Sequence, residues 1–336
     1  MHPDLRRALD AYFSQVARLN NVSSVHQKFA VEPRVQQTLE TNMQESSDFL
    51  SRINVLGVRE MKGEKLGLGV TGPIASRTNT GVDDKERKTR DVHTLEARGY
   101  ECVQTNYDTH LRYNTIDAWA LFPDFQTRVR DVIVQRQALD RMTIGFHGQQ
   151  AAADTDLATH PLLDDVNVGW IKHIQTDAPA RVLADGAAAG EVQVGEGGDY
   201  KNLDALVYDG VQLLDPWYRE APGLVAIMGR QMLHDKYFPL VDDNGKKPTE
   251  ALAADLIISQ KRMGGLQAVT VPYFPEGMVL ITPLNNLSIY YQNGARRRAI
   301  LDNPKRDQIE NYESSNDAYV VEQYGACALI QNIVKV

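Results

Sequence analysis

The sequence predicts an α+β fold. Helical and strand-like segments follow one another in an irregular order, unlike the regular strand–helix–strand alternation of a parallel sheet. A stretch without any period, residues 72–99, lies between two strand-like segments, and most of residues 307–336 is strand-like again. The length of 336 residues suggests about two domains.

The composition is that of a soluble globular protein, with 43 % hydrophobic and 24 % charged residues. The net charge of −8 argues against a protein that binds nucleic acid over its whole surface. Residues 1–29 carry a net charge of +2, so the rest of the chain carries −10. Cys102 and Cys327 stand in apolar contexts and are expected to be reduced thiols of a cytoplasmic protein. Because no signal-like segment and no run of about 18 apolar residues occurs, we expect no standard secretion and no membrane partner.

The first half of the chain predicts three helices and a strand. Residues 4–20 place apolar side chains on one face at helical spacing, which is typical of an amphipathic helix. A second helix is expected over 33–51, with a proline in its first turn, and a strand over 53–58. The longest helix is expected over about 115–144. Its apolar stripe runs opposite a polar face made of Arg128, Arg130, Gln135, Arg136 and Arg141.

The second half mixes shorter elements. Residues 146–200 are mostly loop, with a short helix at 166–170. From residue 202 onward the pattern predicts helices over 202–219, 230–240 and 248–259, and strands over 224–228, 268–273, 278–281, 287–292, 307–312, 318–323 and 325–334.

The stretch from Gly72 to Gly99 is the most informative part of the chain. It contains six basic and five acidic residues, and its few apolar residues fit neither a helical nor a strand period. Structureless loops longer than about 12–15 residues are uncommon inside compact domains and are usually functional or disordered. Because strand-like residues 65–70 and 100–105 bracket it, we expect a hairpin arm that lies on another surface.

No strong catalytic, metal or cofactor motif occurs. Residues 67–72 match the G-x-G-x-x-G pattern of dinucleotide-binding folds, but no helical period follows, so a glycine-rich strand is favoured. His147, Asp154, Asp156 and His160 lack a tight ligand spacing, and Asp242–Gly245 lacks the glutamate of a calcium loop, because Ala251 stands in that place. We therefore expect no metal, no cofactor and no enzyme activity.

Long blocks of the sequence resemble the major capsid protein of Peduovirus-type tailed phages. They include residues 31–39 (VEPRVQQTL), 43–50 (MQESSDFL), 60–65 (EMKGEK), 165–170 (DVNVGW), 203–207 (LDALV), 255–262 (DLIISQKR) and 311–314 (NYES). The resemblance covers nearly the whole chain and weakens at 1–28, 77–98 and 183–197. It implies the Hong Kong 97-type capsid fold and a structural subunit that assembles into hexamers and pentamers of an icosahedral procapsid and capsid.

The resemblance also implies a division of the chain. Residues 1–29 would be a scaffold-interacting propeptide, 30–58 an N-arm and 59–112 the E-loop hairpin. Residues 113–201 and 307–336 would form a peripheral domain with the spine helix at about 115–144, and residues 202–306 an axial domain. We expect the propeptide to be removed by a cut between Phe29 and Ala30, since the resemblance becomes strong there.

Mixed charges on the arm are expected to make contacts between subunits. The residues assigned to such contacts are Arg77, Lys85, Arg87, Lys88, Arg90, Arg296, Arg297 and Arg298. For the last three, which form the arginine cluster, phosphate binding is an equal alternative. Implied partners are other copies of the chain, a scaffolding protein and maturation protease, a portal protein, and packaged double-stranded DNA bound without sequence specificity. The expected location is the virion capsid, assembled in the cytoplasm of a host bacterium.

Three other functions fit the residues less well. A non-viral nanocompartment shell would share the fold but not the removable N-terminal helix. A nucleotide-dependent oxidoreductase rests on residues 67–72 alone. A tail or portal subunit would not be expected to place a long helix directly after a long hairpin.

Overall fold

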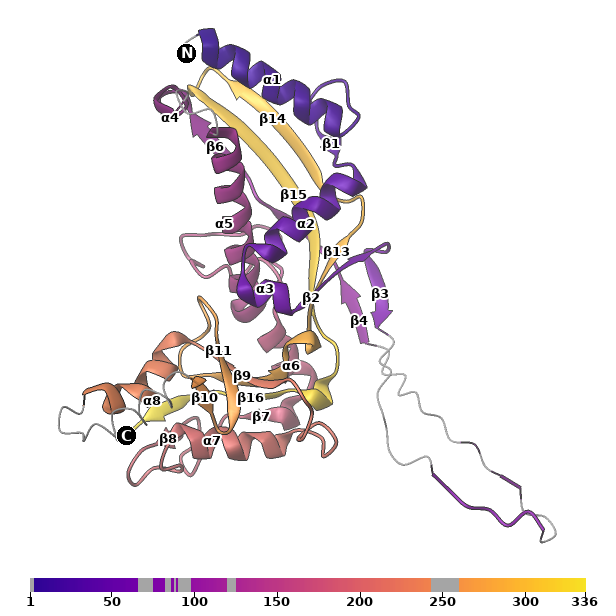
Figure 1. Ribbon diagram of the computed structural model, residues 1–336, viewed down its shortest axis with the longest axis vertical. Helices are drawn as coiled ribbons and strands as arrows, with labels where there is room; N and C mark the ends of the chain where they lie inside the picture. The colour runs from indigo at the N-terminus through magenta and orange to yellow at the C-terminus, as the bar shows by residue number, and fades with distance from the viewer. Residues whose placement is uncertain are drawn as a thin grey trace.

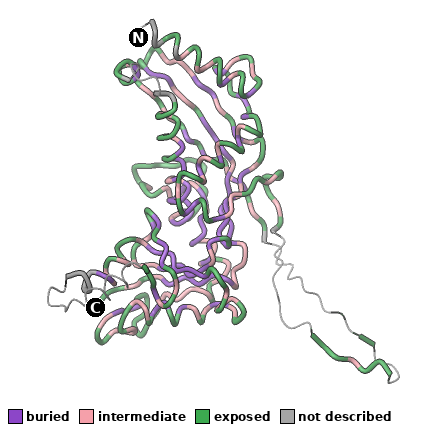
Figure 2. The backbone as a smooth tube through the Cα atoms, in the orientation of Figure 1, coloured by how far each residue is buried: buried purple, intermediate pink, exposed green. Residues whose placement is uncertain are grey.

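The computed structural model describes residues 3–65, 75–81, 86–87, 89, 98–119, 125–242 and 260–336. Two bodies follow one another along the long axis of the molecule, and the base of a hairpin arm lies at the side of the larger one (Figure 1). Buried residues run through the middle of each body, as Figure 2 shows.

The larger body is built on a seven-stranded sheet with the order β1-β14-β15-β13-β2, in which β5 and β6 also pair with β15. Its strands are β1 (Phe29–Ala30), β2 (Asn54–Val58), β5 (Val103–Asn106), β6 (Thr109–Arg112), β13 (Leu287–Gln292), β14 (Arg297–Asn303) and β15 (Gln308–Val321). All neighbours are antiparallel except β13 and β2. The 14-residue β15 is therefore the centre of this body.

Of the helices in the described residues, this body contains α1 (Pro3–Leu19), α2 (Pro33–Glu45), α3 (Asp48–Arg52), α4 (Tyr113–Trp119), α5 (Phe125–His147) and α6 (Trp170–Asp177). Helices α3, α5 and α6 share an aromatic core, whereas α1 and α4 belong to a second cluster. Trp170 is fully buried, meets the rings of Phe146 and Tyr319 edge-on at 5.1 and 5.4 Å, and donates its indole N–H to the Ser288 carbonyl at 3.0 Å.

The smaller body contains a six-stranded sheet with the order β10-β11-β9-β12-β16-β7. These strands are β7 (Val182–Leu183), β9 (Leu224–Met228), β10 (Arg262–Met263), β11 (Leu266–Thr270), β12 (Val279–Pro283) and β16 (Ala328–Ile330). Helices α7 (Leu203–Gly210) and α8 (Arg230–Asp242) and the pair β8 (Val192–Val194) and β17 (Ile333–Lys335) surround it. Single 3-10 turns are η1 (Pro179–Arg181), η2 (Val211–Leu213), η3 (Leu284–Asn286) and η4 (Tyr324–Ala326). All five residues of β9 are buried, as expected for a central strand.

The arm begins as an antiparallel ribbon of β3 (Lys62–Lys65) and β4 (Arg98–Glu101), with Lys65 opposite Arg98. Figure 1 shows this ribbon at the side of the larger body. An antiparallel pair stands at the base of the arm, as expected, but its first strand is β3 rather than residues 65–70, of which 66–70 lie outside the described residues.

Several elements differ from the sequence-based expectations. The helix expected over 33–51 is two helices, because the Ser47 hydroxyl accepts the Leu50 N–H and starts α3. The helix expected over 202–219 ends at Gly210, and the short helix expected at 166–170 begins only at Trp170. The strands expected at 307–312 and 318–323 are one continuous strand, and β14 had no counterpart in the prediction. The helix expected over 248–259 and residues 120–124 of the long helix lie outside the described residues.

Candidate assembly surfaces

The root of the arm is fixed to the larger body. Lys62 and Glu101 form an ion pair of 2.8 Å across the ribbon, and the Cys102 N–H donates to the Met61 carbonyl at 2.8 Å. The Tyr100 ring meets the Tyr290 ring edge-on at 5.1 Å, beside the buried Cys102. Burial, and less so the Asp317 carboxylate, raises the pKa of the Cys102 thiol to about 12. The arm therefore leaves the body from an apolar, ordered base.

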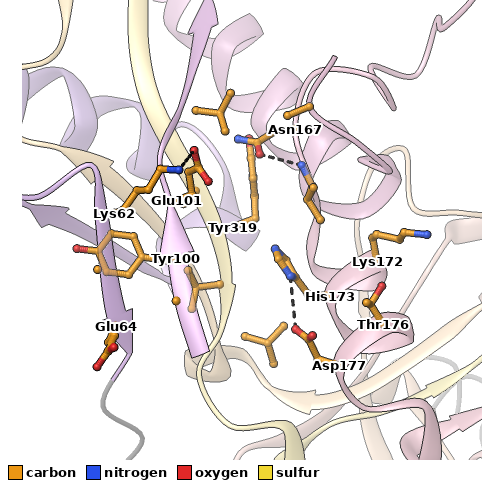
Figure 3. A pocket seen from close by; sticks show the side chains of 18 of the residues that line it. Lys62, Glu64, Tyr100, Glu101, Asn167, Lys172, His173, Thr176, Asp177 and Tyr319 are labelled. Atoms are coloured by element: carbon orange, nitrogen blue, oxygen red, sulfur yellow. Dashed lines mark hydrogen bonds and ion pairs between the residues drawn. The ribbon is translucent and has the colours of Figure 1, made fainter. Parts of the chain in front are cut away.

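A groove of about 1150 Å³ lies between this ribbon and α6. Figure 3 shows Lys62 and Glu101 on the ribbon opposite Asn167 and the α6 residues Lys172 and His173, with the Tyr319 ring between them. Both signs of charge line the walls, and the groove is open to solvent. Such a lining suits a polar, mixed-charge segment more than an apolar ligand.

The N-terminal segment lies over the other end of the sheet. Helix α1 turns Val16, Tyr12 and Phe13 toward a cluster that includes the buried Ile300 and Ile309. Polar contacts reinforce this packing: the Arg298 Nη2 donates to the Tyr12 hydroxyl at 3.1 Å, and Arg6 lies 3.6 Å from the Asp302 carboxylate.

The bond expected to be cut lies in β1, an edge strand of the larger sheet. Phe29 stands opposite Arg298 and Ala30 opposite Arg297 in the β1–β14 pair. The Val31 N–H donates to the Arg296 carbonyl at 2.8 Å, which continues the ladder past the expected cut.

The arginine cluster does not form one surface. Arg296 is only 1 % exposed and donates to Glu40 Oε1 at 2.8 Å and to Glu313 Oε1 at 2.6 Å. The expectation that Arg296 contacts another subunit or a phosphate is wrong, because its guanidinium is already bound to carboxylates of the same chain. Arg297 is exposed, and Arg298 is half-buried against Tyr12 and Asn311.

A buried ion network surrounds Arg296. It consists of Glu40 from α2, Arg141 from α5, Arg296, and Glu313 and Asp317 from β15. Arg141 forks between Glu40 and Asp317, with Nη2 lying 3.0 Å from Asp317 Oδ2. Burial would raise the pKa of the Glu313 carboxyl, but the adjacent Arg296 and Arg298 guanidiniums outweigh it, so this pKa is lowered.

The network joins three elements that are far apart in the sequence, and sequence reasoning missed it. Arg141 was expected on the polar face of the long helix, yet it is 2 % exposed. The available signal was its helical spacing, since Arg141 lies seven residues after Val134 and three after Ala138 on one face, but its carboxylate partners cannot be identified from spacing.

The arm's other candidate contact residues divide into two groups. Arg77 and Arg87 are described and exposed. Lys85, Lys88 and Arg90 lie outside the described residues, as do residues 67–72 with their glycine pattern. Over the part of the chain that the structure describes, no group of three metal-binding side chains is found, and no helix is long and apolar enough to cross a bilayer.

Comparison with known proteins gives consistent matches. The model of the family "Phage major capsid protein, P2 family" matches residues 8–333. The "Capsid proteins" of Escherichia phage P2 are 51 % identical over 342 residues, covering 99 % of this chain and 95 % of theirs. A chain of the "Satellite phage P4 procapsid including size determination (Sid) protein" matches with a TM-score of 0.83 and 48 % identity, over 100 % of this chain and 99 % of that one.

A more distant structure shares only the fold. The "Capsid of empty GTA particle" matches with a TM-score of 0.52 at 15 % identity, over 86 % of this chain and 90 % of that one. The expected capsid fold of the Hong Kong 97 type is thereby confirmed. The arm, the long helix and the two sheets are the parts of a shell subunit, and this chain belongs to the P2 family of phage major capsid proteins.

Proposed function

We propose that this chain forms hexamers and pentamers of an icosahedral procapsid and capsid that encloses double-stranded phage DNA. One observation carries the proposal: the β3–β4 ribbon at the base of the arm lies on an apolar base at the side of the larger body (Figure 1), and the described arm residues Arg77 and Arg87 are exposed. An arm of this kind gains stability only from a surface on another molecule, and in a homomeric shell that molecule is a second copy of the chain.

We assign the parts of the chain to the expected domains. Residues 113–201 and 307–336 form the peripheral domain and residues 202–306 the axial domain, with residues 30–58 as N-arm and 59–112 as E-loop. In support, β9 and α7 lie in the smaller body and α5 in the larger one. The expected bounds and the two sheets disagree at two places. β13 and β14 fall within 202–306 but pair with β15 in the larger sheet. β7, β8, β16 and β17 fall within 113–201 and 307–336 but belong to the smaller body.

Contacts between subunits involve the arm's Arg77, Lys85, Arg87, Lys88 and Arg90, together with Arg297 and Arg298 on β14. Each exposed ion pair contributes about 0–1 kcal/mol. Many weak contacts repeated around a closed shell add up through multivalency. The groove beside α6, with both charge signs on its walls, offers a surface of matching chemistry to a neighbour's arm.

The acidic balance fits a container. A shell that holds DNA without gripping it gains nothing from the strong phosphate binding that a basic surface provides, and the net charge here is −8. Assembly would take place in the host cytoplasm with a scaffolding protein, a maturation protease and a portal. Maturation would remove residues 1–29 by a cut between Phe29 and Ala30.

Replacement of the arm tests the proposal. Since Lys65 and Arg98 are directly opposed, residues 66–97 can be replaced by a two-residue Asn-Gly turn that closes β3 and β4. We expect a folded subunit with an unchanged melting temperature that forms no shells by negative-stain electron microscopy when co-expressed with scaffold and protease. Closed shells from this variant would refute the role of the arm.

The matched control keeps the arm and changes its charge. In Arg77→Ala/Arg87→Ala, two exposed arginines of the arm are removed while its length is retained, and we expect fewer or less stable shells rather than none. Mass measurement of subunits from mature wild-type particles tests the cut separately, since an unshortened chain would exclude it. A nanocompartment shell would also assemble but would keep its N-terminal segment and lack DNA.

A further inference from the structure

We propose that the N-terminal segment shields its own cleavage strand, so that the bond between Phe29 and Ala30 is cut only after α1 has left the sheet. This rests on the proposed maturation cut. It assigns residues 3–29 an autoinhibitory role toward the protease, in addition to any contact with a scaffold.

The backbone around the bond is already used by β14. The Ile300 N–H donates to the Val25 carbonyl at 2.9 Å, Phe29 and Ala30 pair with Arg298 and Arg297, and Val31 donates to residue 296. Proteins that read an extended peptide commonly bind it by main-chain hydrogen bonds, as an added strand. A protease acting in this way could add only at the outer edge of β1, because the inner edge is paired with β14.

The side chains are hidden as well. Phe29 is 9 % exposed, and its neighbours Val25 and Val31 are more deeply buried in the same cluster. Helix α1 contributes Val16 and Phe13 to this cluster and so packs over the strand. A protease pocket has no access to Phe29 while this packing persists.

A buried asparagine connects α1 to the far side of the bond. Asn20 follows the last turn of α1 and donates from Nδ2 to the Val16 carbonyl at 2.9 Å. Its Oδ1 accepts the Glu32 N–H at 3.1 Å, three residues beyond Phe29. Movement of α1 therefore breaks a hydrogen bond on the carboxyl side of the cut, and the strand is expected to loosen together with the helix.

These contacts place the opening of α1 before the cut. Cleavage of a closed segment follows the fraction of molecules in which it is open, whenever opening and closing are fast. Any event that lifts α1, such as capture of its apolar face in an assembling shell, raises that fraction. Subunits that have not assembled would keep their N-terminal segment.

The test uses unassembled full-length subunits and chymotrypsin, whose hydrophobic pocket accepts phenylalanine and therefore reads the bond after Phe29. The loosened variant is Phe13→Ala/Val16→Ala on the packed face of α1. The control is Leu19→Ala on the same helix, where the side chain is 53 % exposed. Mass spectrometry follows the fragment that begins at Ala30, and cutting in the exposed loop at Leu157 serves as an internal reference.

In the wild type we expect cutting after Phe29 to be at least about tenfold slower than in the loosened variant. The control should match the wild type, and the reference rate should be equal in all three. The proposal is overturned if the wild type is cut after Phe29 as fast as the loosened variant. An unshortened subunit in mature particles would instead refute the proposed maturation cut, whatever the chymotrypsin rates.

Discussion

Replacing single members of the arginine cluster separates folding from assembly. Arg296→Ala removes a guanidinium that satisfies Glu40 and Glu313 inside the body. Arg297→Ala removes an exposed side chain one residue further along β14. We expect Arg296→Ala to destabilise the subunit strongly and Arg297→Ala to leave its stability unchanged, although the two residues are adjacent in the sequence.

The magnitude follows from what is left behind. Without Arg296, Glu40 retains Arg141, but Glu313 keeps only a 3.3 Å hydrogen bond from Gln137 within the network. Breaking a buried pair by removing one partner costs about 3–5 kcal/mol. With an unfolding entropy of about 2.1 cal/mol/K per residue, this lowers the melting temperature of a cooperative 336-residue unit by about 4–7 °C. The exposed Arg297→Ala should stay within about 0.5 kcal/mol.

Calorimetry or circular dichroism of unassembled subunits measures both variants. A third variant, Arg296→Met/Glu313→Leu, removes the stranded carboxylate too and should recover part of the loss, since buried ion pairs replaced by apolar residues are often neutral. Equal melting temperatures for Arg296→Ala and Arg297→Ala would refute the assignment of Arg296 to the interior. So would an Arg296→Ala subunit that melts like the wild type but fails to assemble.

Three further predictions concern the core. Gly145→Ala would place a Cβ 2.3 Å from the Trp170 ring and should cost about 1–3 kcal/mol by urea unfolding, whereas Gly229→Ala, with no contact under 3.5 Å, should not. Burial raises the pKa values of Tyr290, Tyr319 and the Cys102 thiol, so the unfolded chain loses these protons first. Stability should therefore fall as the pH rises above about 9, and an unchanged urea midpoint between pH 8 and about 10.5 would contradict this. Cys102 and Cys327 are fully buried and should react with a maleimide only after denaturation, so modification of the native subunit would argue against this packing.

The elements predicted correctly are those whose pattern is local. Helix α1 follows from its apolar face, and β9 and β13 follow from runs of apolar residues between turns. Membership of a capsid family was also accessible, since the blocks that carry the resemblance span most of the chain. The arm was predicted from the absence of such a pattern, because its long segment has no periodic apolar face that could be buried.

Strands β14 and β15 show where such reasoning fails. Arg297 and Arg298 made the start of β14 look like a basic surface patch, and the polar run from Glu313 to Asp317 split β15 into two expected strands. Both readings assume that charged side chains are solvated. Here Glu313 and Asp317 point into the body because arginines from distant segments neutralise them, a condition that no local period records.

The chain around the expected cut is held in two different ways. Helix α1 is attached by apolar contacts, hydrogen bonds and an Arg6–Asp302 pair whose arginine is 62 % exposed and thus screened by water. Helix α2 is attached through Glu40, which is bound by two buried arginines at once. The attachment of α1 is weak enough to open locally. Breaking the attachment of α2 would leave charged groups without partners in the core. A cut between Phe29 and Ala30 falls at the boundary between them, so residues 3–29 are free to leave while the N-arm stays fixed to the body.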